Sequence, residues 1–227
     1  MRSVGRQIEL RFRQWGGKRR NAGRPPRGAT PGVAHLARRI VAGRRPVHVT
    51  MRVVEGLPSL RERVLGAVVL GALADARGGR VGARFRVVHF SVQSNHLHLV
   101  VEADDATSLA RGAGGLATRI AMRVNGALGR RGRVFADRFH ARELRTPAEV
   151  RRALVYVLRN AAKHSGAAVH SQHDVLSSAS AFSGWREPHA RALARPIPWL
   201  EPPRTWLARI GWSRAPGGPI SLDEAPA

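Results

Sequence analysis

The sequence predicts an α+β domain in which an antiparallel sheet carries helices on one face. Three observations lead to this fold class. Residues 84–102 alternate apolar and polar side chains, as a hairpin of two strands does, and residues 146–164 repeat apolar side chains at helical spacing. An earlier segment, residues 46–76, has the pattern of a strand followed by a helix. These segments belong to one patterned domain, residues 46–170.

The predicted hairpin contains the first candidate site. Its strands, residues 84–92 and 96–102, are joined by a short turn, and His96 and His98 share one face of the second strand. Two imidazoles placed in this way can bind a single cation, because neutral imidazole is a common metal ligand. Zinc would need further ligands, and since the chain has no cysteine these would be His, Asp, Glu or water. The alternative is a pair of histidines on the wetter face of a sheet.

The helix over residues 146–164 contains the second candidate. It opens with a capping box in which Thr146 is the N-cap and Glu149 reaches back to it. The apolar stripe of this helix consists of Val150, Ala153, Leu154, Val157, Leu158 and Ala161. At roughly 100° per residue, the single tyrosine of the chain, Tyr156, lies about 130° from the centre of that stripe. Its neighbours on the polar side are Glu149, Arg152, Asn160 and Lys163. A phenol there can act as a nucleophile or contact a ligand; the alternative is a half-exposed surface tyrosine.

The remaining elements complete an order that is readable from the sequence. A strand over residues 46–54 precedes a helix over 59–76, with Ser59 and Glu62 as its capping pair. The side chains of this helix that are expected to face inward are Leu60, Val64, Leu65, Val68 and Leu73. A helix over residues 108–128 follows the hairpin, and its glycines weaken it by about 1 kcal/mol each. These glycines are Gly112, Gly114 and Gly115.

A short strand near residues 139–145 comes before the tyrosine helix. The resulting order, β-α-β-β-α-β-α, is the split βαβ or ferredoxin-like pattern, in which the first and third strands are neighbours. His48 and Thr50 of the first strand would then lie beside His96 and His98 and form the floor of a site. The tyrosine helix must lie over this floor or come from a second subunit.

The composition favours a nucleic-acid partner. The chain has 39 Lys and Arg against 15 Asp and Glu, a net charge of +24, which should make the binding of polyanions strong and salt-dependent. The preference for Arg over Lys suits phosphate, whereas codon bias is a simpler explanation of it. The absence of cysteine excludes disulfides and fits a reducing cytoplasm. No apolar run or signal sequence is recognisable, so neither membrane insertion nor secretion is expected.

Two flanking segments differ from the domain in composition. Residues 1–45 form a basic, Gly/Pro-rich arm that is expected to be disordered, and Arg24 lies there in a Gly-Arg-Pro core like that of minor-groove arms. Residues 171–227 form an irregular tail rich in Ser and Pro. The tryptophans of this tail, which could pack on the domain or stack on bases, are Trp185, Trp199, Trp206 and Trp212.

Several of these residues together resemble a known family. Asn95–Leu99 contains a histidine–hydrophobic–histidine strand, Arg138-Phe139-His140 follows it, and the helix places Asn160 four residues after Tyr156. This order is similar to that of single-tyrosine HUH transposases, and most similar to REP-associated tyrosine transposases. The resemblance covers about residues 46–165. One departure is Asn160-Ala161-Ala162, where many relatives have Asn-Pro, so that the helix need not end at Asn160.

The resemblance implies an HUH domain that cleaves single-stranded DNA and transfers the strand, with Tyr156 as the nucleophile. It implies Mg²⁺ or Mn²⁺ held by His96, His98 and Asn160. The expected partner is DNA that contains a hairpin or repeat. The protein is expected to act as a monomer or homodimer in a bacterial cytoplasm. The residues expected to contact the DNA are Arg138, Arg142, Arg152, Lys163 and Arg24.

Two alternatives remain open at the level of sequence. The first is a non-catalytic nucleic-acid-binding protein on the same fold, in which His96 or Tyr156 can be replaced without loss of function. The second is a metal-dependent hydrolase in which water is the nucleophile. Glu102, which shares the face of the two histidines, is the nearby carboxylate on that strand. His140 is interpreted as a structural residue that links its strand to the tyrosine helix.

Overall fold

The computed structural model describes residues 45–76, 84–165 and 174–226, apart from the side chains of residues 161–165. Four strands form one antiparallel sheet in the order β2-β3-β1-β4. The strands are β1 (Val47–Arg52), β2 (Phe85–Val92), β3 (His96–Ala103) and β4 (His140–Glu143). The first and third strands are therefore neighbours, as predicted.

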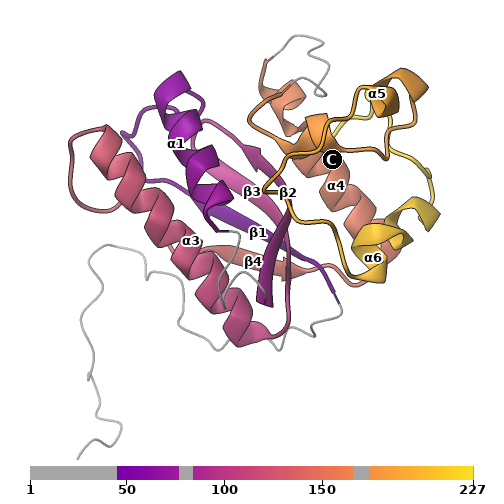
Figure 1. Cartoon of the computed structure of the whole chain (residues 1–227), viewed down its shortest axis with the longest axis horizontal. Helices are drawn as coiled ribbons and strands as arrows, with labels where there is room; N and C mark the ends of the chain where they lie inside the picture. The colour runs from indigo at the N-terminus through magenta and orange to yellow at the C-terminus, as the bar shows by residue number, and fades with distance from the viewer. Residues whose placement is uncertain (1–44, 77–83, 166–173, 227) are drawn as a thin grey trace, which may run out of the picture. The chain divides into compact units, whose positions relative to one another are not determined.

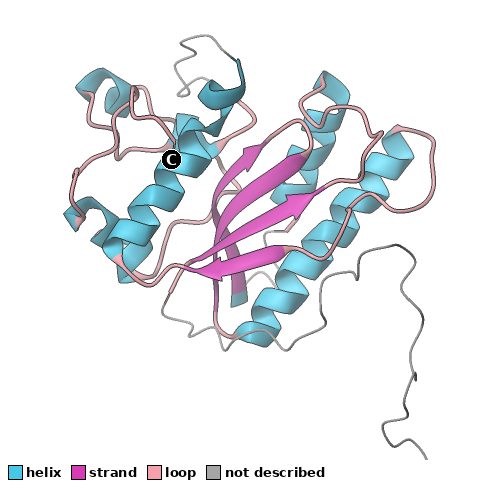
Figure 2. Cartoon of the chain, turned by 180° about the vertical axis from the view of Figure 1, so that it is seen from behind, coloured by secondary structure: helices cyan, strands magenta, loops and turns pink. Residues whose placement is uncertain are grey.

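Helices cover both faces of this sheet (Figure 1). Helices α1 (Arg63–Ala74) and α3 (Ala106–Ala127) lie side by side on one face. The predicted α+β class with an antiparallel sheet is confirmed, but the prediction placed helices on one face and the structure has a further helix on the other. The tyrosine helix α4 (Pro147–Ser165) lies on the opposite face, so the sheet is enclosed between two helical layers (Figure 2). The helix that covers the predicted floor thus belongs to the same chain.

The alternation predicted for the hairpin is confirmed. Leu97, Leu99 and Val101 of β3 are completely buried in the core beneath α1 and α3. Val47 and Val49 of β1 are buried in the same core. Because successive side chains of a strand point to opposite faces, His96 and His98 are directed toward α4.

Helix α1 starts later than the sequence predicts. It begins at Arg63, and its N-cap Glu62 makes no side-chain capping hydrogen bond. The Ser59 hydroxyl instead accepts a hydrogen bond from the backbone N–H of Arg61, at 3.2 Å. Ser59 therefore stabilises a turn before the helix, and the predicted capping pair does not form.

The buried face of α1 is rotated from the predicted one. Leu65, Val69 and Leu73, each four residues after the previous one, are completely or almost completely buried. Val64, which was predicted to face inward, is 57% exposed. Leu60 is buried too, but it packs from the preceding turn and so does not determine which side of the helix faces the sheet.

The helices in the described part of the tail, residues 174–226, are all short, yet this segment packs closely on α4. These helices are η2 (Ser178–Ala181), α5 (Pro188–Ala192), α6 (Trp206–Arg209) and η3 (Gly211–Arg214). A second hydrophobic core joins Leu154 and Leu158 of α4 to Trp185, Trp212 and Ile220 of the tail. The apolar stripe of α4 therefore faces the tail.

Three of the four tail tryptophans pack on the domain, as the sequence favours. Trp185 is completely buried and Trp212 is 7% exposed. Trp199 is partly buried, and its ring centroid lies 5.1 Å from that of Phe90 in β2. Trp206, in contrast, is 57% exposed.

The tail also covers the edge strand β2. The backbone N–H of Val92 donates to the carbonyl oxygen of Leu176 at 2.8 Å, and that of Glu201 donates to the carbonyl oxygen of Val87 at 3.3 Å. Exposed sheet edges invite pairing with other chains, and a covering segment prevents it. The tail is therefore part of the folded domain in structural terms.

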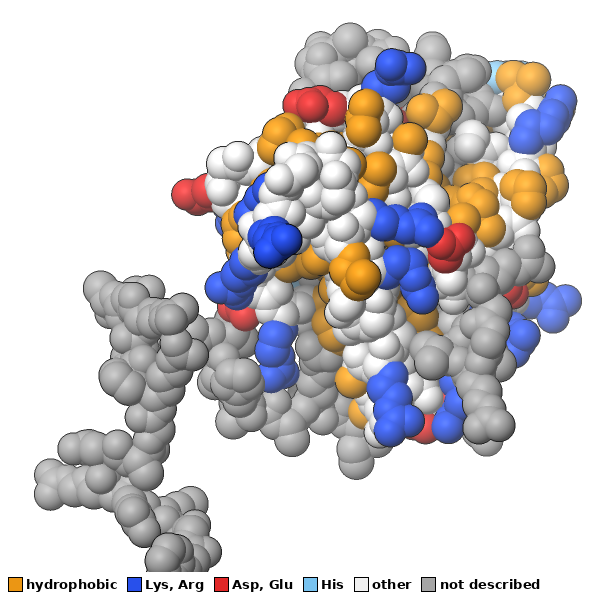
Figure 3. Space-filling model, turned by 60° about the vertical axis from the view of Figure 1, so that its left-hand side comes forward, with side chains coloured by type: hydrophobic (Ala, Val, Ile, Leu, Met, Phe, Trp, Pro, Cys, Tyr) orange, Lys and Arg blue, Asp and Glu red, His pale blue; other side chains and the backbone are white. Residues whose placement is uncertain are grey.

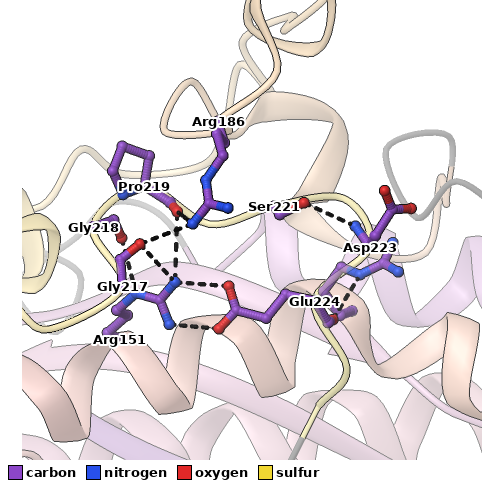
Figure 4. A network of polar contacts seen from close by, with 9 residues as sticks. Arg151, Arg186, Gly217, Gly218, Pro219, Ser221, Asp223 and Glu224 are labelled. Atoms are coloured by element: carbon purple, nitrogen blue, oxygen red, sulfur yellow. Dashed lines mark hydrogen bonds and ion pairs between the residues drawn. The ribbon is translucent and has the colours of Figure 1, made fainter.

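The final residues of the tail are attached to α4 by a polar network (Figure 4). The Arg151 guanidinium donates to both carboxylate oxygens of Glu224, at 2.5 and 2.7 Å, and to the carbonyl oxygen of Gly218 at 2.8 Å. Two turns along the same helix, Arg159 Nε donates to the carbonyl oxygen of Glu224 at 3.2 Å. Two arginines of α4 thus bind one residue near the end of the tail.

The predicted basic arm, with Arg24, lies outside the described residues. Within the described parts of the chain, no helix is both long enough and apolar enough to cross a membrane.

Candidate functional site

The capping box predicted for α4 is present and fixes the first turn of the tyrosine helix. The backbone N–H of Glu149 donates to Thr146 Oγ1 at 3.2 Å, and the N–H of Thr146 donates to Glu149 Oε2 at 3.3 Å. The N–H of Arg145 donates to the same carboxylate oxygen at 2.5 Å. These bonds satisfy donors that a helix end otherwise leaves unpaired, and they define where the helix begins.

Tyr156 lies over the sheet, against the predicted floor. Its ring centroid is 4.8 Å from that of His98, with an angle of 86° between the planes, and 6.1 Å from that of His48. The side of α4 that carries Tyr156 is polar in sequence and is only partly exposed: Arg152 is exposed, whereas Tyr156 is half-buried and Asn160 is completely buried. The sheet covers the part of this side near Tyr156, and the tail packs on the apolar stripe.

His98 is held by two residues of the neighbouring strand. Its Nδ1 lies 3.2 Å from Thr50 Oγ1 and 3.3 Å from His48 Nε2. The register of β1 and β3 explains these contacts, because Thr50 is directly opposite His98. With Nδ1 engaged in this way, Nε2 is the nitrogen that would coordinate a cation. His48 and Thr50 therefore orient the ring of His98.

His96 is oriented by its own neighbour in the chain. Its Nδ1 lies 2.6 Å from Asn95 Oδ1, and its ring centroid lies 4.5 Å from that of His98. An amide oxygen only accepts hydrogen bonds, so Nδ1 of His96 carries the proton and Nε2 keeps a lone pair. The asparagine that precedes the two histidines thus selects the tautomer suited to metal binding.

Asn160 is the unusual polar residue of the site. Its side chain is completely buried, one turn after Tyr156, and neither its amide nitrogen nor its amide oxygen has a hydrogen-bond partner among the described residues. A buried polar group without a partner costs roughly 1–3 kcal/mol. A cation bound at the amide oxygen, or a water that accepts from the amide nitrogen, would reduce that cost.

The donor set for a metal is restricted to few side chains. In the described ranges, no group of three or more His, Asp or Glu side chains is placed to hold a metal ion. The predicted ligands are therefore two imidazoles and one amide oxygen, which leaves the remaining positions of a cation to water or substrate. Imidazole and amide donors accommodate several divalent ions.

Glu102 is not available as a further ligand. Its carboxylate accepts from the Arg86 guanidinium at 2.8 Å, and from the backbone N–H groups of Arg204 and Thr205 at 2.9 and 2.8 Å. Burial raises the pKa of this carboxyl, but the bonds to Arg86 and to these backbone groups outweigh it and leave the pKa lowered. Glu102 is therefore a structural anchor for the tail.

His48 is neutral in the folded protein near pH 7. Burial and, to a smaller extent, the positive charges of Arg142 and His140 together lower the pKa of the imidazole to about 4. Both of these residues lie on β4, where Arg142 is opposite His48 and His140 is opposite Thr50. His140 is exposed, and does not pack between its strand and α4 as the sequence interpretation supposed.

The predicted DNA-contacting arginines are on the surface. Arg138, Arg142 and Arg152 are exposed. Arg138 precedes β4, Arg142 lies in β4, and Arg152 lies on α4. The side chain of Lys163 lies outside the described residues. Basic side chains are also spread over the side of the molecule that is on the left in Figure 1, where acidic ones are sparse (Figure 3).

Two buried polar residues next to the site were missed in the sequence. Ser91 of β2 is the partner of His98 in the sheet and is completely buried. The Gln93 amide donates to the Ser91 hydroxyl at 2.6 Å. Residues 89–92 alternate polar and apolar side chains, so this short alternation could have placed Ser91 on the polar face of β2.

Comparisons with known proteins add a limited likeness. No protein-family model matches the chain, and no curated protein matches it. One solved structure that is similar is described as the structure of a REP-associated tyrosine transposase bound to a REP hairpin. It is 16% identical in sequence, with a TM-score of 0.49, over 76% of this chain and 93% of that one. The function is therefore argued from the geometry of the site.

Proposed function

We propose that the protein cleaves and rejoins single-stranded DNA through a covalent link between Tyr156 and a 5′ phosphate. The observation that carries this proposal is the packing of Tyr156 on His98, with ring centroids 4.8 Å apart, beside a second oriented histidine, His96. A phenol thus packs on one of two neighbouring imidazoles, and the buried amide of Asn160 lies one turn after the tyrosine on the same helix. The net charge of +24 suits a polyanionic substrate.

The residues of the site fit a divalent cation such as Mg²⁺ or Mn²⁺. His96 and His98, each held at Nδ1, and the unpaired amide of Asn160 would hold it. When bound, such a cation neutralises charge that develops on a phosphate oxygen. The neutral imidazole of His48 adds no positive charge that would oppose the binding of the cation.

The chemistry requires Tyr156 to lose its phenolic proton. The phenolic oxygen forms a bond to the phosphorus, the bond between phosphorus and the 3′ oxygen breaks, and that oxygen leaves as a hydroxyl after it takes up a proton. A protonated phenol is a weak nucleophile, so the reaction depends on a positive local field. Arg142 of β4 is an exposed cation on the same sheet face. The phosphotyrosine bond conserves the energy of the broken phosphodiester bond, so a 3′ hydroxyl can later attack it and rejoin the strand.

The two alternatives differ from this proposal in the role of single residues. A hydrolase that uses water would profit from a carboxylate near the histidines, but Glu102 is engaged by Arg86 and by the tail. A non-catalytic binding protein would have no need of an unpaired buried amide at Asn160. Both observations favour the covalent enzyme.

The test is a covalent-adduct assay on the full chain. Single-stranded DNA with hairpins, labelled at either end, is incubated with the protein and Mn²⁺ or Mg²⁺, and the products are separated under denaturing conditions. We expect an adduct that carries the strand on the 3′ side of the cut, together with a free 3′ hydroxyl. Tyr156→Phe, which removes a single oxygen, should abolish the adduct.

Matched histidine variants separate a role in the site from general damage to the protein. His98→Asn should lose the metal-dependent adduct, whereas His189→Asn, at an exposed position on α5, should form it at the wild-type rate. Cleavage that persists in Tyr156→Phe would establish water as the nucleophile. Tight DNA binding without any adduct would instead support the non-catalytic protein.

A further inference from the structure

An open pocket of about 580 Å³ lies between β2 and the tail, apart from the tyrosine site. Its lining includes Val88 and His89 of β2, Phe182 and Trp212 of the tail, and Arg191 and Arg209 at the ends of α5 and α6. This part of the tail is drawn in orange to yellow in Figure 1. We refer to it as the β2–tail pocket.

A bulge in β2 creates the wall of the β2–tail pocket. The pairing of β2 with β3 shifts between Val87 and His89, so that Val88 is an extra residue without a partner in β3. Such a bulge redirects neighbouring side chains, and bulges are frequent next to binding sites. Here Val88 and His89, which are adjacent in sequence, both line the same pocket.

His89 offers a polar atom in this otherwise apolar wall. It is 9% exposed, and its Nδ1 lies 3.2 Å from Ser178 Oγ. Burial lowers its pKa to about 4, so the imidazole is neutral near pH 7. Among the described residues, Nε2 of His89 has no hydrogen-bond partner. The ring is thus held from one side and can exchange a hydrogen bond on the other.

Aromatic rings provide the apolar surface of the pocket. Phe182 contacts His89 edge-on, with ring centroids 5.7 Å apart, and its centroid lies 5.3 Å from that of Trp212. Because Phe182, Trp212 and Ala179 belong to the second core, these rings are fixed by packing. Flat, rigid aromatic surfaces of this kind stack on nucleobases irrespective of sequence.

The charges at the rim favour an anion. Arg191 and Arg209 are exposed, and within the described part of the chain neither guanidinium forms an ion pair. Glu201 also lines the pocket and is partly buried. Aromatic walls, a neutral imidazole and two cations at the rim match the parts of a nucleotide: its base and its phosphates.

We propose that the β2–tail pocket binds an unpaired base of single-stranded DNA, with the adjoining phosphates on Arg191 and Arg209. The base would enter from the single-stranded part of the substrate, stack on the aromatic wall and exchange a hydrogen bond with His89 Nε2. This inference rests on the proposed function for the identity of the nucleic acid. It adds a recognition site on the side of the molecule formed by the tail, where sequence or strand position can be read before cleavage.

The test uses photo-crosslinking to full-length protein that carries Tyr156→Phe, without metal, so that no covalent chemistry interferes. The probe is a hairpin with an unpaired flank that contains one 5-iodouracil, moved along the flank in successive probes. We expect crosslinks to the peptides that contain Phe182 or Trp212 from at least one position. Crosslinks confined to peptides outside the pocket would overturn the proposal.

A pair of tryptophan variants supplies the matched control. Ser183→Trp places a large side chain in the lining of the pocket, whereas Val175→Trp replaces an apolar residue that is 75% exposed and lies outside it. Ser183→Trp should abolish the crosslink and weaken binding of the flank about tenfold or more, on the scale of one stacked base. Val175→Trp should change neither. Equal crosslinking in both variants would contradict the proposal.

Two outcomes distinguish failure of this proposal from failure of the proposed function. Pocket crosslinks in a protein whose wild type forms no adduct would leave the pocket established as a site for single-stranded DNA and would remove the catalytic role of Tyr156. Adduct formation by the wild type without pocket crosslinks would support the catalytic role of Tyr156 and would reject the pocket as a binding site for single-stranded DNA. If Ser183→Trp does not fold, the double variant Arg191→Gln/Arg209→Gln replaces it, and a several-fold loss of crosslinking is expected.

Discussion

His98 is the residue at which the helix and the sheet of the site meet. Its ring contacts Tyr156 of α4 on one side, and its Nδ1 is held by Thr50 and His48 of β1 on the other. Each of these three contacts involves a residue distant in sequence, so alternation along a strand could indicate the face of His98 but not its partners. A hydrogen bond to one ring nitrogen fixes both the orientation and the tautomer of the imidazole.

At the scale of single residues, His89 is expected to make stability depend on pH. Its pKa is about 4 in the folded protein, against 6.5 for an ordinary histidine, because its burial disfavours the charged form. The unfolded chain therefore takes up a proton first as the pH falls. The contribution of His89 to the free energy of unfolding is fully present above pH 6.5. It is lost as the pH falls toward 4, by up to about 1.4 kcal/mol per pH unit.

The variant His89→Asn removes this titration. Between about pH 7.5 and about pH 5, the free energy of unfolding in urea should fall by roughly 2 kcal/mol less in the variant than in the wild type. The exposed residue His189 serves as the control, because His189→Asn should keep the wild-type dependence on pH. An unchanged dependence in His89→Asn would mean that the imidazole is not neutral and buried as described.

At the scale of elements, the capping-box pattern in the sequence predicted the start of one helix correctly and the start of another incorrectly. Thr146 and Glu149 form the predicted capping box, whereas Ser59 and Glu62 do not. Leu60 explains the difference, because it is completely buried from the turn before α1, and its backbone N–H donates to the carbonyl oxygen of Ser94 at 2.8 Å. A tertiary contact therefore keeps residues 59–62 outside the helix.

Helix α3 offers a matched pair of glycines for a test at this scale. A Cβ built on Gly112 would lie 2.1 Å from Phe85 Cγ, whereas at Gly114 nothing lies within 4 Å. Gly112→Ala should thus lower the free energy of unfolding by about 1–3 kcal/mol through overpacking. Gly114→Ala should raise it by up to about 1 kcal/mol, since alanine favours helix.

Thermal and urea denaturation of the two variants would measure the difference directly. The sequence alone assigns both glycines the same destabilising effect on the helix, because intrinsic propensity does not depend on neighbours. Opposite signs for the two substitutions would show that Gly112 is required by its close approach to β2. Equal effects would mean that Phe85 moves aside without cost.

At the scale of the whole molecule, the tail completes the domain that contains the site. It covers the edge of β2, buries the apolar stripe of α4 and is anchored by Arg151 and Glu224. Since α4 carries Tyr156 on one side and the tail on the other, the position of the tyrosine depends on both. The predicted boundary at residue 170 marks a change in composition, and the packing continues across it.

Breaking the anchor should destabilise the whole fold. Arg151 is 7% exposed, and Arg151→Met would leave the partly buried carboxylate of Glu224 without its partner, at a cost of roughly 2–4 kcal/mol in the free energy of unfolding. Arg152→Met, at the next and exposed position, should change it by less than about 0.5 kcal/mol. Urea denaturation measures both.

The double variant Arg151→Met/Glu224→Gln tests the pairing itself. It should recover part of the loss, because no charge is then left without a partner, and the coupling energy follows from the double-mutant cycle. Additive effects of the two substitutions would contradict a direct interaction. A helix–tail connection of this kind could not be predicted, because the two residues are 73 positions apart in sequence.

The sequence by itself determined the order of the elements, the neighbouring placement of β1 and β3, and the face on which His48, Thr50, His96 and His98 lie. These follow from local periodicity and from the few topologies that such an order allows. Only the tertiary structure decided that Asn160 is buried without a partner, that Glu102 anchors the tail, and that His89 lines a pocket. Such features arise from contacts between distant segments, and burial, not residue type, then determines what a polar side chain can do.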